Sequence, residues 1–183
     1  MNAYFVLWPN DWCKRLLQAG DNGPLQVLYG GPHTSVPSLG KVAADDLIYP
    51  VMVKEGQLYI LGCLQVTHIT EAEAYLQVHN INTVDTMWDT SAPKLLKQQP
   101  MLGHQVPRTC VDHAATGSGT RIRFDCNLSA ETVSQLRLGP KIGQEKALAI
   151  GTDGKISAIP LQGHYRRLSA DSAKLIADLM QNF

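Results

Sequence analysis

Cysteine and histidine side chains gather in one part of the sequence, where they could hold a zinc ion. Cys110 stands three residues before His113, and the group also includes His104 and Cys126. Structural zinc sites combine thiolate and imidazole ligands, usually as two closely spaced pairs. This group has one close pair, and Cys126 follows Phe124 at the spacing of one strand face, where a thiol packs as a small apolar group. The sequence therefore predicts no bound metal and no cofactor.

Residue types suited to catalysis also occur in this region. Cys110, Asp112 and His113 have the types of a nucleophile, an orienting acid and a base, but a triad is defined by geometry, so the types alone do not predict cysteine catalysis. Motifs of nucleotide-binding loops, zinc proteases, serine hydrolases and zinc deaminases do not occur. His33 and His164 each lie in a glycine-containing loop segment, where an imidazole can face a ligand. These patterns favour binding over catalysis.

Guanidinium groups concentrate in the second half of the chain, where they could contact phosphates. Residues 120–126 alternate as in a half-buried strand, which places Arg121 and Arg123 on its exposed face. Arg166 and Arg167 precede the predicted C-terminal helix, whose first N–H groups favour an anion. The candidate phosphate-binding residues are Arg108, Arg121, Arg123, Arg166 and Arg167. The alternative is a solvated polar face, because Asp125 shares the exposed face of the strand.

Length and composition indicate one folded domain. The chain has 183 residues, of which 44% are hydrophobic and 17% are charged, so it has enough apolar material for a core. We expect residues 1–183 to form a single domain in which residues 80–107 are a long irregular insertion. Lys and Arg together number 16, as do Asp and Glu, so no overall charge attracts nucleic acid or a membrane. The sequence shows no signal-peptide pattern and no membrane-spanning apolar run, which predicts a cytoplasmic protein.

A long apolar hairpin is the strongest structural signal. It covers residues 46–69, turns at Glu55 and Gly56, and contains Gly62, where a strand can bend. The first half of the chain should also contain strands at 3–8 and 25–29 and helices at 10–19 and 71–79. The second half should contain a strand at 120–126, a helix at 130–137 capped by Ser129, a hairpin at 146–159, and a C-terminal helix at 169–182 capped by Ser169. These elements indicate an α+β protein.

Two segments resemble the PUA-like superfamily, which includes the EVE, ASCH and YTH domains. Residues 4–12 form a strand that ends in an aromatic residue and leads into a helix, and residues 46–66 form the long hairpin. The resemblance covers about the first 70 residues. It implies a small, curved β-barrel with helices at its rim, to which this chain adds a C-terminal helix.

The resemblance also implies a ligand, because PUA-like domains commonly bind nucleic acid and several take one modified base into an aromatic-lined pocket. A base stacked on an aromatic ring contributes about 1 to 3 kcal/mol. The candidate walls of such a pocket are Trp8, Trp12, Tyr29, Tyr49 and Trp88, although such residues also commonly pack in cores. We expect a non-enzymatic module that binds DNA, RNA or a base-like small molecule. Two alternatives remain open: a protein-interaction or inhibitor protein, and an enzyme acting on a nucleotide-like substrate.

Overall fold

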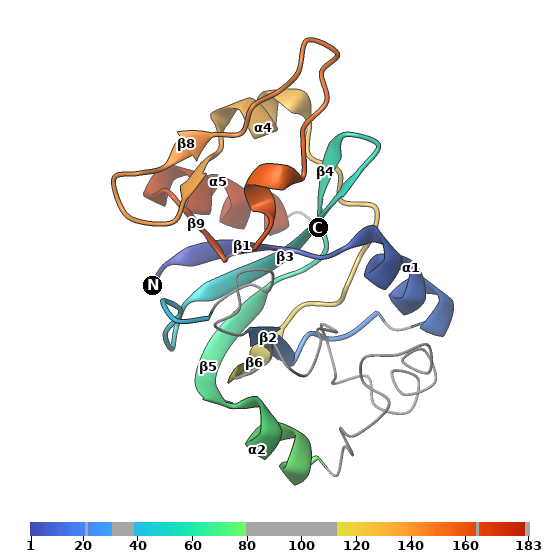
Figure 1. Cartoon of the computed structure of the whole chain (residues 1–183), viewed down its shortest axis with the longest axis vertical. Helices are drawn as coiled ribbons and strands as arrows, with labels where there is room; N and C mark the ends of the chain where they lie inside the picture. The colour runs from blue at the N-terminus through green and yellow to red at the C-terminus, as the bar shows by residue number, and fades with distance from the viewer. Residues whose placement is uncertain (21, 31–38, 80–112, 164, 182–183) are drawn as a thin grey trace.

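A nine-stranded mixed sheet organises the computed structural model, which describes residues 1–20, 22–30, 39–79, 113–163 and 165–181. The strand order is β2-β6-β5-β3-β1-β9-β7-β8, with β4 paired to β3 (Figure 1). The strands are β1 (Ala3–Leu7), β2 (Val27–Gly30), β3 (Leu47–Lys54), β4 (Gln57–Ile60), β5 (Leu64–Glu71), β6 (His113–Gly119), β7 (Arg137–Gly139), β8 (Lys146–Ala147) and β9 (Arg166–Leu168). The helices are α1 (Asn10–Ala19), α2 (Ala72–Val78), α4 (Ala130–Gln135), α5 (Ala170–Met180) and the short 3-10 helix η3 (Ile159–Leu161). The predicted α+β class and C-terminal helix are confirmed.

The predicted long hairpin is present, and its strands β3 and β5 lie in the middle of this sheet. Glu55 and Gly56 connect β3 to β4 with positive φ angles of 55° and 81°. The second arm breaks around Gly62 into β4 and β5, and its pairing with β3 shifts by one residue there. Pro50 of β3 lies opposite this shift, and its carbonyl accepts a hydrogen bond from the Leu61 N–H at 2.8 Å. A proline has no N–H to donate, so it fits a strand at an irregularity of this kind.

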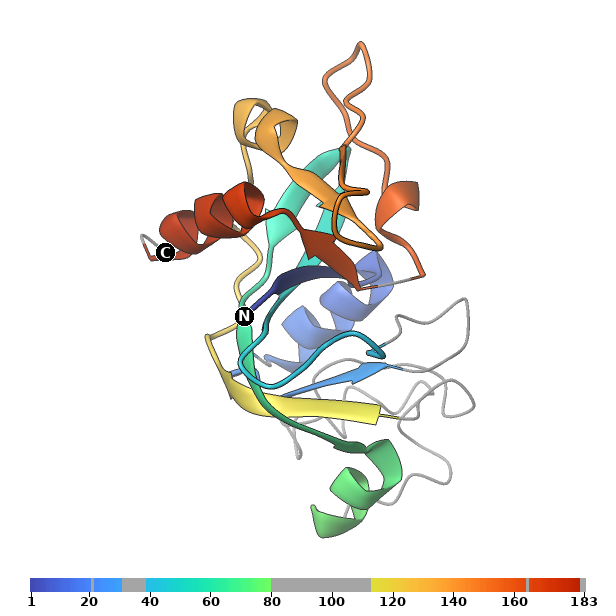
Figure 2. The ribbon, with the colours of Figure 1, turned by 90° about the vertical axis from the view of Figure 1, so that its left-hand side faces the viewer.

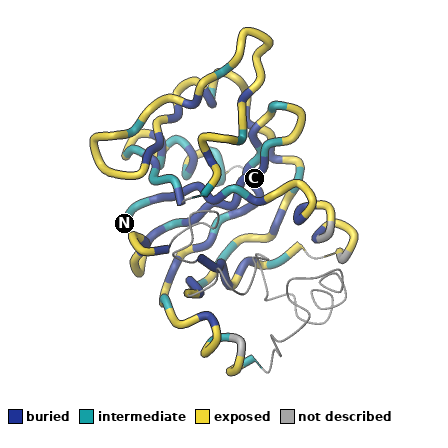
Figure 3. Tube along the Cα trace, viewed as in Figure 1, coloured by how far each residue is buried: buried dark blue, intermediate teal, exposed yellow. Residues whose placement is uncertain are grey.

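Strand β1 separates two apolar cores. Tyr4, Val6 and Trp8 point into the first core, which α1 covers, whereas Ala3 and Phe5 point into the second, which α4 and α5 cover. This alternation follows from the two-residue repeat of a strand that is buried on both faces. Figure 3 shows the buried residues along the central strands and the exposed ones along the outer turns. Helix α2 lies at the opposite end of the molecule from α4 and α5 (Figures 1 and 2).

The sheet does not close into the barrel that the resemblance implied. Strands β2 and β8 are the two ends of the strand order, and no pairing among the described residues joins them. Strand β5 curves strongly (Figures 1 and 2), and its register with β6 shifts between Val66 and His68. The expected curvature is therefore present. The sheet stays open because β9, β7 and β8 extend it beyond β1 and do not return to β2.

Several local predictions are confirmed and others are wrong. Helix α1 ends at Gly20 in the left-handed conformation, and the Ser129 and Ser169 side chains cap α4 and α5. Residues 120–126 form no strand, although Arg121, Ile122 and Arg123 alternate in burial as predicted. The predicted hairpin at 146–159 is reduced to β8 and one isolated bridge. The insertion at 80–107 lies outside the described residues. No helix in the described part of the chain combines the length and apolar character that crossing a bilayer requires.

Candidate functional site

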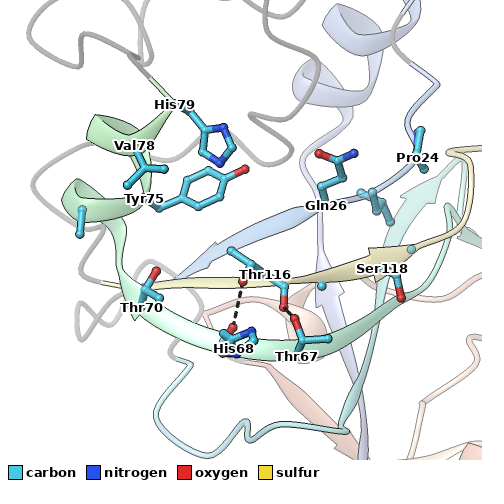
Figure 4. Close-up of a pocket in the computed structure, with 14 residues that line it drawn as sticks. Pro24, Gln26, Thr67, His68, Thr70, Tyr75, Val78, His79, Thr116 and Ser118 are labelled. Atoms are coloured by element: carbon cyan, nitrogen blue, oxygen red, sulfur yellow. Dashed lines mark hydrogen bonds between the residues drawn. The ribbon is translucent and has the colours of Figure 1, made fainter.

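An open groove of about 750 Å³ lies between α2, strands β5 and β6, and the segment that leads into β2 (Figure 4). Its polar lining includes Gln26, Thr67, Tyr75, His79, Thr116 and Ser118. The volume falls in the range of about 300 to 1,000 Å³ that is typical of small-ligand sites. The groove is therefore the best candidate for a binding site in the described part of the chain.

One wall of the groove is an aromatic pair on α2. Tyr75 and His79 are four residues apart, so they share one helix face, and their ring centroids are 4.4 Å apart at an interplanar angle of 47°. Tyr29 of β2 meets Tyr75 edge-on with centroids 6.2 Å apart. Ala72, at the start of α2, is buried in the first core and anchors the helix there. The aromatic pair is thus held in place from beneath and faces the groove (Figure 4).

The Tyr75 hydroxyl is a hydrogen-bond donor at neutral pH. Burial raises the pKa of Tyr75 to about 12, so the phenol stays protonated well above physiological pH. In Figure 4 its hydroxyl end points across the groove toward Gln26. The Gln26 carbonyl accepts a hydrogen bond from the Gly117 N–H at 3.1 Å, while its side chain is exposed. The backbone of Gln26 is fixed, and its amide is available to a ligand.

The floor of the groove is formed where β5 bulges against β6. The Thr67 hydroxyl donates to the Thr116 carbonyl at 3.1 Å, and the Thr116 hydroxyl donates to the His68 carbonyl at 3.4 Å (Figure 4). Bulges often redirect side chains next to functional sites. Gly117 is required here because a Cβ at that position would overlap the carbonyl oxygen of Gln65. The floor therefore has threonine hydroxyls beside exposed backbone.

The groove surface is mostly apolar, with polar side chains among the apolar ones, and its described residues carry no permanent charge. Among the described residues that line it, none is Asp, Glu, Lys or Arg. The titratable side chains are His68, Tyr75 and His79. Apolar contacts come from residues such as Leu25 and Val78, the latter 78% exposed on α2. This composition suits a flat, neutral molecule with polar edges.

The predicted aromatic residues that the structure describes lie in the two cores. Trp8, Trp12 and Tyr29 are buried in the first core and Tyr49 in the second, and none of the four is more than 5% exposed. Trp88, His33 and His164 lie outside the described residues. Of the four described aromatics, Tyr29 alone is connected to the groove, through its contact with Tyr75. A ligand could reach the others only by displacing core side chains.

The four predicted arginines that the structure describes form no strip along the groove. Arg123 forms an ion pair with Asp125 at 2.9 Å, and Arg121 and Arg123 line a separate hollow of about 160 Å³. Arg166 donates to the Gln162 carbonyl at 3.0 Å, and burial lowers the pKa of its guanidinium. Arg167 forms an ion pair with Glu145 at 2.8 Å. The fifth, Arg108, lies outside the described residues.

The zinc candidates are only partly described. His113 begins β6 in an exposed position, whereas Cys126 is buried in the second core, where burial raises the pKa of its thiol. His104 and Cys110 lie outside the described residues. Among the residues that the structure does describe, no three His, Cys, Asp or Glu side chains form a group that could hold a metal ion.

Sequence reasoning missed the groove, although one signal for it was present. The helix at 71–79 was predicted, and its spacing already placed Tyr75 and His79 on one face. The floor gave no such signal, because β6 has the sequence HAATGSG and lacks apolar alternation. Comparisons of the chain with protein-family models, with curated proteins and with solved structures find no match. The groove must therefore be interpreted from its own geometry.

Proposed function

We propose that the protein is a non-enzymatic binding module that takes a planar, base-like ring into the groove beside α2. The observation that carries this proposal is the aromatic pair of Tyr75 and His79, which faces the Gln26 amide across a groove floored by threonine hydroxyls (Figure 4). The rings offer a stacking surface, and the amide and hydroxyls offer hydrogen bonds to the polar edge of the ring. Base recognition outside a duplex combines these same two kinds of contact.

The volume of the groove, the rigidity of Tyr75 and the amide of Gln26 all fit a planar, base-like ring. A groove of about 750 Å³ has room for a heterocycle and an attached sugar. Tyr75 packs on Tyr29 and so loses little freedom when a ring stacks on it. The Gln26 side chain has both a donor and an acceptor, so it can pair with adjacent polar atoms of a base.

The proposal keeps the predicted kind of ligand and changes its location. The PUA-like resemblance of residues 4–12 and 46–66 supports a base-binding role, and we retain that relationship as part of the proposal. Stacking is assigned to Tyr75 and His79 in place of Trp8 and Trp88. A free small molecule and a base of a DNA or RNA strand both present this planar surface.

Replacement of Tyr75 by Ala tests the stacking wall. We expect Tyr75→Ala to weaken binding of nucleosides or short single-stranded oligonucleotides about 5- to 150-fold, because one stacking contact contributes about 1 to 3 kcal/mol. Isothermal titration calorimetry measures this loss, and thermal melting checks that the variant is folded. Gln26→Ala provides a second variant, since its exposed side chain plays no part in the core.

Tyr59→Ala is the matched control. Tyr59 is also a partly buried tyrosine that packs against the first core, but it lies on β4 and does not line the groove. We expect its replacement to leave binding unchanged. The proposal fails if neither nucleosides nor oligonucleotides bind the parent protein, or if Tyr75→Ala and Tyr59→Ala bind equally well.

A further inference from the structure

The charge and hydrogen-bonding character of the groove narrow the class of ligand. We infer that the ligand is an uncharged heterocycle with N–H donors, such as a free base or nucleoside, and that the site selects against phosphorylated nucleotides and polynucleotide strands. This inference rests on the proposed function, and it adds which form of base-like molecule the groove accepts.

The first observation concerns charge. The described residues that line the groove include no Lys or Arg, so nothing among them would compensate a phosphate. Two of the described arginines that were expected to do so form ion pairs elsewhere: Arg123 with Asp125, and Arg167 with Glu145. Against the described lining, a phosphate would give up water without gaining an ion pair, which is unfavourable.

The second observation concerns the direction of the hydrogen bonds on the floor. The Thr67 hydroxyl proton is used by the Thr116 carbonyl, and the Thr116 hydroxyl proton is used by the His68 carbonyl. A hydroxyl has one proton and two acceptor lone pairs, so toward the groove both threonines present lone pairs. Such a floor attracts N–H groups and repels anionic oxygens. Amino groups and ring N–H groups of bases meet this requirement.

The distinguishing experiment compares neutral and charged probes of the same base. Calorimetric titrations would use adenosine, cytidine, their 5′-monophosphates and a short single-stranded oligonucleotide at about 50 and about 200 mM salt. We expect the nucleosides to bind at least about tenfold more tightly than their monophosphates, with affinities that do not change with salt. The inference is overturned if the monophosphates or the oligonucleotide bind as tightly as the nucleosides, or if binding weakens steeply with salt.

The outcomes separate this inference from the proposed function. If phosphorylated probes bind best and Tyr75→Ala still removes their binding, the proposed function stands and the selection for neutral ligands is wrong. If no probe binds, or if Tyr75→Ala binds every probe like the parent protein, the proposed function fails and the inference fails with it.

A second set of variants tests the acceptor floor. Thr116→Val keeps the branched shape of the side chain and removes its lone pairs, so we expect adenosine to bind about three- to tenfold more weakly. Purine riboside lacks the amino group of adenosine, and its affinity should not respond to this substitution. Thr152→Val is the matched control, because Thr152 lies in an exposed turn. It should change the affinity for neither adenosine nor purine riboside. If Thr116→Val leaves adenosine binding unchanged, the donor requirement is wrong.

Discussion

Truncation of Ile60 tests the central hairpin most directly. Ile60 lies on β4, is 1% exposed and belongs to the second core. Ile60→Ala removes three carbon atoms from the core. Burial of each stabilises the fold by about 0.8 kcal/mol, so their loss lowers the free energy of unfolding by about 2.4 kcal/mol. The cavity that remains lowers it further. Ile60 also borders the hollow of about 160 Å³ that Met180 lines, so Met180 can move into part of the new space. We therefore expect the free energy of unfolding to fall by about 3 kcal/mol.

Urea denaturation followed by circular dichroism and tryptophan fluorescence measures this change. Trp8 and Trp12 are buried in the first core and Ile60 in the second, so coincident transitions by the two methods would show that both cores unfold together. Thermal melting should show a decrease in Tm of about 6 to 12 °C. Ile142→Ala is the control: Ile142 is 77% exposed, and its loss should change stability by less than about 0.5 kcal/mol. A loss below about 1 kcal/mol for Ile60→Ala would contradict the close packing of the hairpin.

Three further predictions concern other parts of the fold. Asp46→Ala should lower the free energy of unfolding by about 2 to 4 kcal/mol, measured by urea denaturation. The buried Asp46 carboxylate accepts a hydrogen bond from the Asn2 N–H at 2.6 Å, and the substitution leaves that donor without its partner. A variant as stable as the wild type would contradict this role. Gly117→Ala should reduce amide-exchange protection more in β5 and β6 than in the other strands, because its Cβ would overlap the β5 backbone. Unchanged protection in β5 and β6 would refute the close approach of the two backbones. Cys63 has a pKa raised to about 11 by burial, so its thiolate forms only as the pH rises toward that value. At pH 8 its alkylation, followed by mass spectrometry, should be about two orders of magnitude slower than that of a free thiol, and an equal rate would disprove the shift.

The parts of the fold that the sequence predicted correctly are those with local causes. Gly20 ends α1 because it adopts a left-handed conformation, and Ser169 caps α5 through its own side chain. The turn at Glu55 and Gly56 is likewise defined within a few residues. Each of these signals depends on neighbours in the chain, so a single sequence contains enough information to recognise it.

The missed parts depend on partners far away in the chain. Strand β6 has a polar, glycine-rich sequence and is a strand because β2 and β5 pair with its two edges. Residues 120–126 have the alternation of a strand, but their N–H groups bond to scattered partners, such as Ile122 to the Asn22 carbonyl and Arg123 to the Leu61 carbonyl. The groove combines α2 with β6 and Gln26, so its existence could not be predicted before the pairing of these segments was known.

The position of β1 has a consequence for synthesis of the protein on the ribosome. One edge of β1 pairs with β3, but the other pairs with β9, where Tyr4 is the partner of Arg167. Translation at about 5 to 20 residues per second therefore leaves this edge without its native partner for about 8 to 30 seconds. An unpaired strand edge of a nascent chain is a site for aggregation. A strand that is almost fully buried in the finished protein thus has an edge that needs protection by chaperones while the chain is being made.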